Sequence, residues 1–436
     1  MRLALLSVIS ATTLQACGAP RSEPVDPQVV LVGQTQDAAA QQPSFASGLR
    51  LIVDVDCGRE LQTRRDDRVD RIARALAVSF QLLPVPTQAL SSDVLARLDA
   101  KVGIVAQGAD GFLLRAMDPA DQPLIDQVIA KECSGEWRLW SQANSPGVAC
   151  RVQASAASAI QQSALEQARE TVARRLTASG LGGTVTLRGT QLVLEVASAQ
   201  HAPEDWKQVI LQGGRLEFRL VDDESDFVAA FARSVPQGQL PDTVRFESES
   251  VPAGPGRYRT SVFATARLGA GESLVSARDK LIRLLAILDL PATRRLALAK
   301  TSRFDPDTQT AVEDGWRTYV VHSHAEIAAI DLSDVSAQPE PMGASGHAWS
   351  VRLRFTEPGA KRFETLTGGN VKRRMAILMD DEVHSAPVIM SAIGGGSATI
   401  TIGASASSEA DARRLVMLMR TGAMSARLTL NTEERR

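Results

Sequence analysis

The sequence lacks the charge imbalance and the aromatic content that nucleic-acid-binding proteins use. Its 436 residues carry 48 Lys and Arg against 50 Asp and Glu, a formal net charge of −2. No basic surplus is available to neutralise phosphates, and aromatic residues, at 4%, are too few for a surface on which bases stack. We therefore expect no nucleic-acid partner. The length and the 44% hydrophobic content indicate a globular chain, with roughly two to four domains.

Long hydrophobic runs and nucleotide-binding motifs are also missing. A membrane-spanning helix needs about 18 consecutive apolar residues, and residues 281–290, the nearest candidate, are interrupted by Arg283 and Asp289. No Walker loop is present, and no Gly-x-Gly-x-x-Gly follows a predicted strand, so we expect no nucleotide cofactor.

The histidines give little indication of a catalytic or metal site. His322 and His324 would project from one face of a strand as two potential metal ligands, but no third ligand stands at a suitable spacing. We expect them on a solvated strand face and predict no metal site. His384 lies beside Ser385 and near Asp380, but without the strained turn that exposes a nucleophilic serine. The sequence therefore predicts no enzyme.

The N-terminus is typical of an exported protein. Arg2 precedes about a dozen mostly apolar residues, and the segment Leu14-Gln15-Ala16-Cys17 resembles the lipobox of bacterial lipoproteins. We predict a signal peptide over residues 1–17, lipidation of Cys17, and a flexible tether over residues 18–45. The chain would then be anchored in the cell envelope and face the periplasm, in either the inner or the outer membrane. The alternatives are an ordinary cleaved signal and no export.

The remaining cysteines favour one disulfide. Cys133 and Cys150 flank a strand and a turn, and a bond between them would close a loop of about 16 residues and stabilise the fold by about 3 kcal/mol. Cys57 would remain a buried, unreactive thiol. No Cys-x-x-Cys motif is present to suggest zinc or redox chemistry.

Hydrophobic periodicity indicates an α+β fold with a repeated architecture. Strand and helix patterns follow the order βαββαβ over residues 46–147 and again over residues 148–222, where a capping box at Ser163 and Glu166 begins a helix. Two such units predict two ferredoxin-like subdomains in series. A third α+β unit follows over residues 223–436.

Four stretches of the sequence resemble SecD, the large exported-domain subunit of the SecDF complex of bacterial protein export. They are residues 48–56, residues 164–196 with Arg174 and Arg175, residues 214–221, and a set that includes Gly359, Lys361, Phe363, Asn370, Arg374, Asp380, Pro387, Arg420, Thr421 and Gly422. The resemblance implies that residues 148–222 form a base-like subdomain and residues 223–436 a P1 head-like subdomain.

SecD proteins normally continue into several transmembrane helices that harness the proton gradient, whereas this sequence ends at Arg436. We therefore expect the exported domain alone, without proton coupling. The resemblance then implies a non-enzymatic envelope module that weakly and promiscuously binds unfolded or translocating polypeptide, or docks on the Sec translocon or a SecDF-type complex. The alternative is an interaction or structural component of another envelope complex with one fixed protein partner. A third hypothesis is an enzyme or metal protein.

Methionines and glycines near the C-terminus are candidates for polypeptide contact. Flexible methionine side chains suit a surface that accepts many sequences, which makes Met375, Met390 and Met417 candidates, although the favoured alternative is that they replace Leu and Ile in the core. The run Gly394, Gly395 and Gly396 is either a hinge near such a surface or a wide hairpin. Unpaired strand edges could hold an extended chain in a third way.

Overall fold

The structure, a computed structural model, describes residues 48–86, 88–140, 147–196, 206–236, 238, 240–254, 256–306, 310–341, 347–401, 408–424 and 426–435. The predicted signal peptide and tether, with Cys17, lie outside the described residues. Helices alternate with largely antiparallel sheets, which confirms the α+β fold class. Within the described ranges, no helix is both long enough and apolar enough to cross a membrane.

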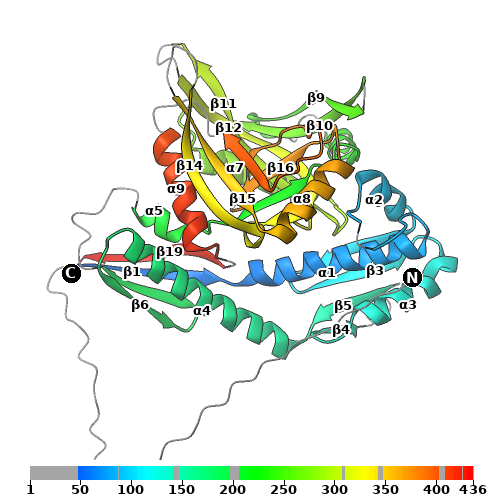
Figure 1. Ribbon diagram of the computed structural model, residues 1–436. Helices are drawn as coiled ribbons and strands as arrows, with labels where there is room; N and C mark the ends of the chain where they lie inside the picture. The colour runs from blue at the N-terminus through cyan, green and yellow to red at the C-terminus, as the bar shows by residue number, and fades with distance from the viewer. Residues whose placement is uncertain are drawn as a thin grey trace, which may run out of the picture. The chain divides into compact units, whose positions relative to one another are not determined.

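The first sheet joins segments from both ends of the described chain (Figure 1). Its antiparallel order is β19 (Arg427–Arg435), β1 (Leu49–Asp56), β7 (Gln191–Val196) and β6 (Gly183–Arg188). In β1 the buried residues Leu49, Leu51, Val53 and Val55 alternate with more exposed ones, as expected for a strand with one face in a core. They pack with α4 (Ala154–Ala178) and with Ile210 of α5 (Trp206–Leu211).

Two long insertions interrupt the connections of this sheet. The first insertion, between β1 and α4, contains α1 (Gly58–Ser79), α2 (Ser92–Asp99), β2 (Val102–Gln107), β3 (Gly111–Ala116), η1 (Pro119–Asp121), α3 (Gln122–Glu132), β4 (Trp137–Trp140) and β5 (Val148–Val152). Its strands form an antiparallel sheet of order β2-β3-β5-β4. The core of this sheet packs against apolar residues of α1, α2 and α3.

The prediction of two βαββαβ units in series is wrong in its allocation of strands. β1, assigned to the first unit, pairs with β7 and β19, whereas β5, assigned to the second, pairs with β3 and β4. The count of two ferredoxin-like units is therefore not confirmed. Periodicity identifies each strand from its own residues, but pairing depends on contacts between segments that are distant in the sequence.

The second insertion runs from β8 to α9 and carries two further sheets. Its elements are β8 (Leu216–Leu220), α6 (Phe227–Ser234), β9 (Val244–Gly254), β10 (Arg257–Arg267), α7 (Leu274–Leu285), β11 (Arg294–Asp305), β12 (Thr310–His322), β13 (Ile327–Ala328), η4 (Ala329–Asp331), β14 (Leu332–Pro341), β15 (His347–Phe355), α8 (Glu357–Gly369), β16 (Met375–Met379), β17 (Glu382–Ser385), β18 (Ser397–Thr401) and α9 (Ser408–Thr421). The strand orders are β13-β8-β16-β17-β11-β12-β10-β9 and β14-β15-β18.

Aromatic and aliphatic side chains join these two sheets in one core. Phe218 of β8, Phe355 of β15 and Phe363 of α8 have ring centroids 4.6 to 6.4 Å apart. Thr356 caps α8, because its side chain accepts a hydrogen bond from the backbone N–H of Gly359, and Pro358 lies in the first turn. This packing fixes α8, one wall of the cleft described below.

Helix α4 begins earlier than the sequence predicts. The capping box at Ser163 and Glu166 predicted its start, but the helix begins at Ala154 and contains both residues. The alanine-rich segment before Ser163 has high helix propensity, and Ile160 buries its side chain against the first insertion. The prediction of a helix was right and its start was wrong.

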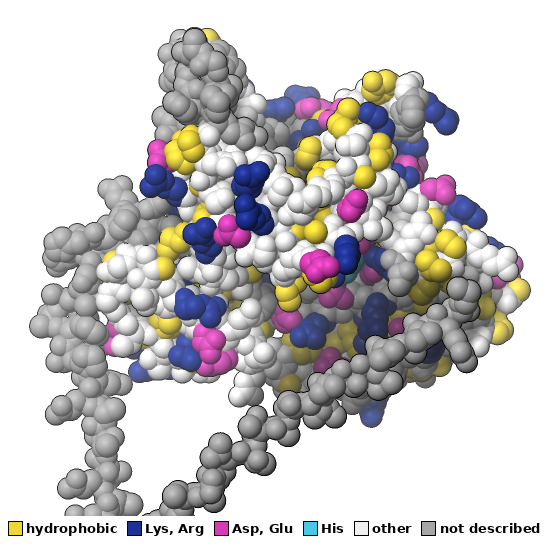
Figure 2. Space-filling view, in the orientation of Figure 1, with side chains coloured by type: hydrophobic (Ala, Val, Ile, Leu, Met, Phe, Trp, Pro, Cys, Tyr) yellow, Lys and Arg dark blue, Asp and Glu magenta, His cyan; other side chains and the backbone are white. Residues whose placement is uncertain are grey.

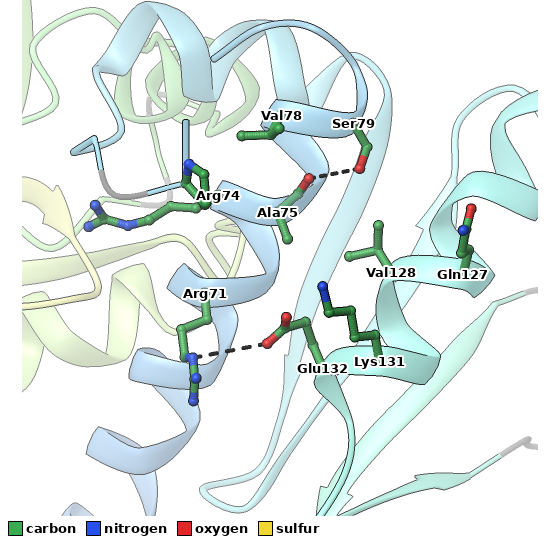
Figure 3. Close-up of a pocket in the computed structure, with 10 residues that line it drawn as sticks. Arg71, Arg74, Ala75, Val78, Ser79, Gln127, Val128, Lys131 and Glu132 are labelled. Carbon is green, nitrogen blue, oxygen red and sulfur yellow. Dashed lines mark hydrogen bonds and ion pairs between the residues drawn. The ribbon is translucent and has the colours of Figure 1, made fainter. Parts of the chain in front are cut away.

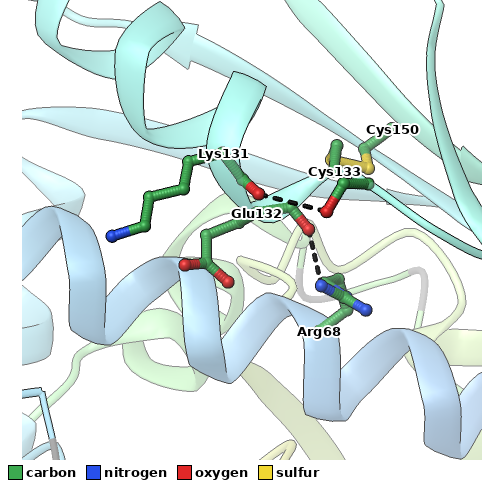
Figure 4. Close-up of a disulfide and its surroundings, with 6 residues drawn as sticks. Arg68, Lys131, Glu132, Cys133 and Cys150 are labelled. Carbon is green, nitrogen blue, oxygen red and sulfur yellow. Dashed lines mark hydrogen bonds between the residues drawn. A yellow bond between two sulfur atoms is a disulfide. The ribbon is translucent and has the colours of Figure 1, made fainter.

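Cys133 and Cys150 form a disulfide in the structure (Figure 4). Cys133 follows the last turn of α3, and Cys150 lies in β5. The Cα atoms of the two cysteines are 6.2 Å apart. Beside them, Arg68 of α1 donates a hydrogen bond to the backbone oxygen of Glu132 at 2.5 Å. Cys57 is a buried free thiol, and burial raises its pKa above the ordinary value.

Candidate functional site

A cleft of about 650 Å³ lies between helix α1 and the second insertion. We call it the α1–α8 cleft; its walls are α1, the β12–β13 turn, η4 and α8. Charged lining residues of both signs are present: Arg71, Arg74, Arg215, Lys361 and Arg362, and Asp67, Asp70, Glu217, Glu326 and Asp331. On the face that Figure 2 shows, basic and acidic side chains are likewise interspersed. The cleft can therefore meet charged groups of either sign.

Ion pairs across the cleft connect α1 to the β12–β13 turn. Arg74 donates to Asp70 at 2.6 Å and to Glu326 at 3.2 Å. Burial lowers the pKa of Arg74, but the two carboxylates outweigh this effect and the net pKa is raised. His324 Nδ1 lies 2.9 Å from Asp67. Burial also lowers the pKa of His324, but the hydrogen bond with Asp67 and the nearby carboxylates of Asp70 and Glu326 together outweigh this effect, so this pKa is raised.

Apolar groups lie among these charges. Ile330 of η4 is 86% exposed, an unusual position for a large aliphatic side chain. Pro86, Ala89 and Ala325 line the same cleft, and the buried Leu366 lies at its α8 wall. The cleft therefore offers apolar contact beside paired charges, a combination that can accept segments of varied sequence.

A second hollow of about 520 Å³ adjoins the first on the other side of α1 (Figure 3). It shares Arg71, Arg74 and Pro86 with the α1–α8 cleft and extends to α3. Arg71, whose side chain is 64% exposed, lies 4.0 Å from Glu132 across it. Ala75, Val78 and Val128 supply apolar lining. Together the two hollows extend the accessible surface along α1.

A buried ionic network fixes the floor of the α1–α8 cleft. Glu217 accepts from Arg219 Nε at 2.9 Å and also pairs with Arg215. Burial raises the pKa of Glu217, but Arg219 and Arg215 outweigh it and lower this pKa to about 2. Arg219 also donates to the backbone oxygen of His322 at 3.0 Å. The charges beneath the cleft therefore hold the end of β12 in place.

The prediction of a solvated strand face for the two histidines is wrong for His322. His322 is 4% exposed, and burial lowers its pKa to about 3, although the carboxylate of Asp222 opposes this shift. It is the last residue of β12, whereas His324 lies in the following turn and pairs with Asp67. The two imidazoles therefore lie in different surroundings, because β12 ends between them.

Asp380 lies in the turn between β16 and β17, and His384 and Ser385 are the last two residues of β17. Asp380 accepts backbone hydrogen bonds from Gly214 and Arg215, each at 3.0 Å. Its carboxylate therefore orders the chain entering β8, while His384 and Ser385 lie exposed at the end of β17. Among the residues that the structure describes, no group of three or more His, Cys, Asp or Glu is arranged to hold a metal ion.

Arg175 of α4 joins the chain segments that enter and leave the second insertion. Its buried guanidinium donates to Thr421 Oγ1 at 3.2 Å and to the backbone oxygen of Gly422 at 2.9 Å. It also donates to the backbone oxygens of Ile210, at 3.2 Å, and Gly213, at 3.1 Å. Burial lowers the pKa of Arg175 to about 10. We call this set of contacts the Arg175 clamp.

Sequence reasoning did not predict the clamp, although both of its halves were visible in the sequence. The pair Arg174 and Arg175 and the segment containing Thr421 and Gly422 were noted as separate points of resemblance. Only the fold brings them together. Gly214 completes the arrangement, because its φ is +70° and a Cβ there would lie 2.8 Å from the Arg175 guanidinium.

The methionine candidates separate into buried and exposed positions. Met375 is 4% exposed and belongs to the core between the two sheets, so its assignment to a binding surface is wrong. The packing of its side chain in one cluster with Phe218, Phe363 and Leu366 explains this burial. Met417 is half-buried on α9, and Met390 is 66% exposed. Neither Met390 nor Met417 lines the α1–α8 cleft.

Gly394, Gly395 and Gly396 connect β17 to β18, which belong to different sheets. The wide-hairpin interpretation is therefore wrong, because a hairpin requires its two strands to pair. The backbone oxygen of Gly396 accepts from the N–H of Phe355 at 2.9 Å. Gly395 and Gly396 have φ values of +82° and +69°, a region that glycine adopts readily.

These observations define the class: an α+β protein in which a two-sheet insertion is clamped to a four-stranded sheet and forms a mixed-charge cleft with α1. Residues 306–426 match the family model for the SecDF P1 head subdomain. Together with the relatives described next, this match confirms the resemblance to the SecD periplasmic domain. The matched residues include the β12–β13 turn, η4 and α8, three of the four walls of the α1–α8 cleft.

Relatives among characterised sequences are protein translocase subunits. The chain is 26% identical over 256 residues to protein translocase subunit SecD of Anaeromyxobacter dehalogenans, covering 53% of this chain and 38% of that protein. It is 47% identical over 76 residues to SecD of Syntrophobacter fumaroxidans, covering 17% of this chain and 14% of that protein. The matched region thus spans less than two fifths of either relative's length.

Two solved structures show a more distant likeness. A crystal structure of SecDF in a super-membrane-facing form has 22% identity and a TM-score of 0.37, covering 63% of this chain and 28% of that one. A structure of SecDF, a membrane component that enhances protein export, has 23% identity and a TM-score of 0.35, covering 62% and 92%.

Proposed function

We propose that this chain is a non-enzymatic accessory domain of protein export, exposed in the periplasm, that binds unfolded or translocating polypeptide in the α1–α8 cleft. The observation that carries the proposal is that the SecDF P1 head match includes three of the four walls of this cleft. The relatives named above are translocase subunits. The proposal transfers a role in export from those proteins to the cleft.

The chemistry of the cleft supports weak binding of many sequences. Ile330 offers a large apolar surface, and exposed cations such as Arg362 lie close to it. The charges that line the walls are mostly paired with one another, so a bound segment need not supply one particular counter-charge. Such a surface favours binding driven by apolar contact and tolerant of sequence.

A matched pair of substitutions tests the proposal. Ile330→Asp places a charge at the apolar contact of the cleft, whereas Val275→Asp makes the same kind of change at a 69% exposed residue on α7. The readout is affinity for a reduced, unfolded exported protein and for its native form. We expect binding of the unfolded form only, weakened about fivefold or more by Ile330→Asp and unchanged by Val275→Asp. Equal binding of native and unfolded protein would contradict the proposal.

We also propose that lipidated Cys17 anchors the domain to a membrane and positions it for contact with the Sec translocon or a SecDF-type complex. Cys17 lies outside the described residues, so this proposal rests on the lipobox-like sequence. Mass spectrometry of the protein from its native membrane should find an acylated N-terminal cysteine, and Cys17→Ala should release the chain from that membrane. An unprocessed Met1 would contradict it.

A further inference from the structure

Among the residues that the structure describes, the sheet of the first insertion has one face in the core and one face that carries exposed side chains, which we call the open face. The inner face buries Ile104, Phe112, Leu114 and Cys150 against the helices. Directly paired residues of neighbouring strands project from the same face, and successive residues alternate between faces. Val105, Leu113 and Ala149, each next to one of the buried residues, therefore project from the opposite face.

An apolar row crosses this open face. Val105 pairs with Leu113, Leu113 with Ala149, and Ala149 with Trp140, so the row spans β2, β3, β5 and β4. The side chains at the two ends of the row are exposed, Val105 by 43% and Trp140 by 49%. The small side chain of Ala149, between Leu113 and Trp140, is buried. Three strand spacings of about 4.8 Å make the row about 14 Å long.

Arginines flank the row on both sides. Arg115 of β3 is exposed on one side, and Arg138 of β4 and Arg151 of β5 are paired with each other on the opposite side. The Arg151 guanidinium lies 4.9 Å from the centroid of the Trp140 ring. It also forms an ion pair with Asp110 at 3.8 Å. The rim of the open face is therefore basic.

We propose that this face binds an amphipathic helix of a partner protein, with an apolar stripe flanked on both sides by Asp or Glu. A row of 14 Å matches about ten residues of an α-helix. The central strands β3 and β5 are already paired on both sides, so their backbone groups cannot accept an added strand. A partner must therefore bind to the side chains of this face. A helix is the element that covers such a face in α+β folds.

The charge pattern selects this occupant over two others. A second copy of the chain would bring the same arginines against each other, which is unfavourable. A lipid surface would favour a broad apolar patch, whereas here the apolar side chains form a single row bounded by Arg115 on one side and by Arg138 and Arg151 on the other. The proposal does not depend on the function proposed for the α1–α8 cleft.

The test uses the full chain and a synthetic amphipathic peptide of about three helical turns, with a leucine stripe flanked by glutamates. A second peptide replaces each glutamate with lysine. We expect measurable binding of the glutamate peptide by fluorescence anisotropy, and at least about tenfold weaker binding of the lysine peptide. Trp140→Ala and the double variant Arg138→Glu/Arg151→Glu should each weaken binding of the glutamate peptide by a similar factor.

Arg188→Glu, on an exposed residue of β6 in the other four-stranded sheet, is the matched control and should leave binding unchanged. Circular dichroism and the thermal midpoint verify that each variant is folded. Equal binding of the two peptides, or binding that is insensitive to Trp140→Ala and to the double variant, would overturn the proposal. So would the absence of peptide binding together with Trp140-dependent binding to phosphatidylglycerol vesicles, which would assign the face to lipid.

Discussion

Arg175 and Thr421 are 246 positions apart in the sequence and are joined by a hydrogen bond of 3.2 Å. The bond ties helix α4 to the point where the chain leaves the second insertion. The same guanidinium binds backbone oxygens at the point where the chain enters it. One side chain therefore contacts both crossings, together with the hydrogen bond from the N–H of Met424 to the backbone oxygen of Gly213.

Arg175→Met should destabilise the fold strongly. It would remove the guanidinium donor from the Thr421 hydroxyl and from the backbone oxygens of Ile210 and Gly422, whereas the backbone oxygen of Gly213 would keep the N–H of Met424. We expect a loss of about 3 kcal/mol or more in the free energy of unfolding, measured by urea denaturation. Arg169→Ala, on a solvent-exposed residue of the same helix paired with Glu166, should leave the free energy of unfolding nearly unchanged, because exposed ion pairs contribute little to stability. Similar losses for the two variants would refute the assigned role of the clamp.

The Cys133–Cys150 disulfide should stabilise the sheet of the first insertion. The two residues are 17 positions apart, and closing a loop of this size stabilises a fold by about 3 kcal/mol. The double variant Cys133→Ser/Cys150→Ser should unfold at lower urea concentration and become insensitive to reductant. Cys57→Ala should retain the wild-type response to reductant, because Cys57 is outside the disulfide. A wild-type midpoint unaffected by reductant would contradict this prediction.

The His324–Asp67 pair should make stability depend on pH. The folded-state pKa of His324 is raised above its ordinary value, which is about 6.5 in the unfolded chain. The stabilisation is therefore complete below the unfolded pKa and is lost as pH rises through the folded pKa. His324→Gln should lower the free energy of unfolding at pH 5.5 to 6, by less than about 1 kcal/mol, and have little effect at pH 9.

Asp67→Asn is the companion variant for this measurement, because it removes the carboxylate and keeps the imidazole. It should reduce the same pH-dependent contribution. A difference between wild type and His324→Gln that stays constant from acid to alkaline pH would show that the ion pair does not cause the effect.

Met375 and Met390 should respond very differently to truncation. Met375→Ala opens a cavity in the core between the two sheets of the second insertion, and we expect it to cost about 2–5 kcal/mol. Met390 is 66% exposed, so Met390→Ala should change stability by less than about 0.5 kcal/mol. Urea denaturation of both variants measures the difference. A large loss for Met390→Ala would mean that its side chain contributes to packing.

Local pattern predicted the type of most elements, because periodicity and capping act within a few residues. The alternation of Leu49, Leu51 and Val53 is a local strand pattern, and Thr356 with Pro358 is a local pattern for the start of a helix. Local pattern did not predict that β1 pairs with β19, where Leu49 lies opposite Arg435. Nor did it predict the burial of Met375, because an apolar residue in a strand has the same local pattern on a covered or an open face.

The candidate site depended almost wholly on long-range contacts. Asp67, Arg74, His324 and Glu326 carry no motif, and they meet only because the second insertion packs beside α1. The open face of the first insertion is similar: each residue of its row is unremarkable in sequence, and strand register alone aligns Val105, Leu113 and Trp140.

By itself, the sequence determined the α+β class, most of the helices and strands, and the resemblance to SecD. Each of these depends on patterns or motifs that lie within one short segment of the chain. The tertiary structure alone decided which strands share a sheet, which polar groups Arg175 joins and where charged residues from distant segments form a cleft. Pairing and packing minimise the free energy of the whole chain, and no single segment contains that information.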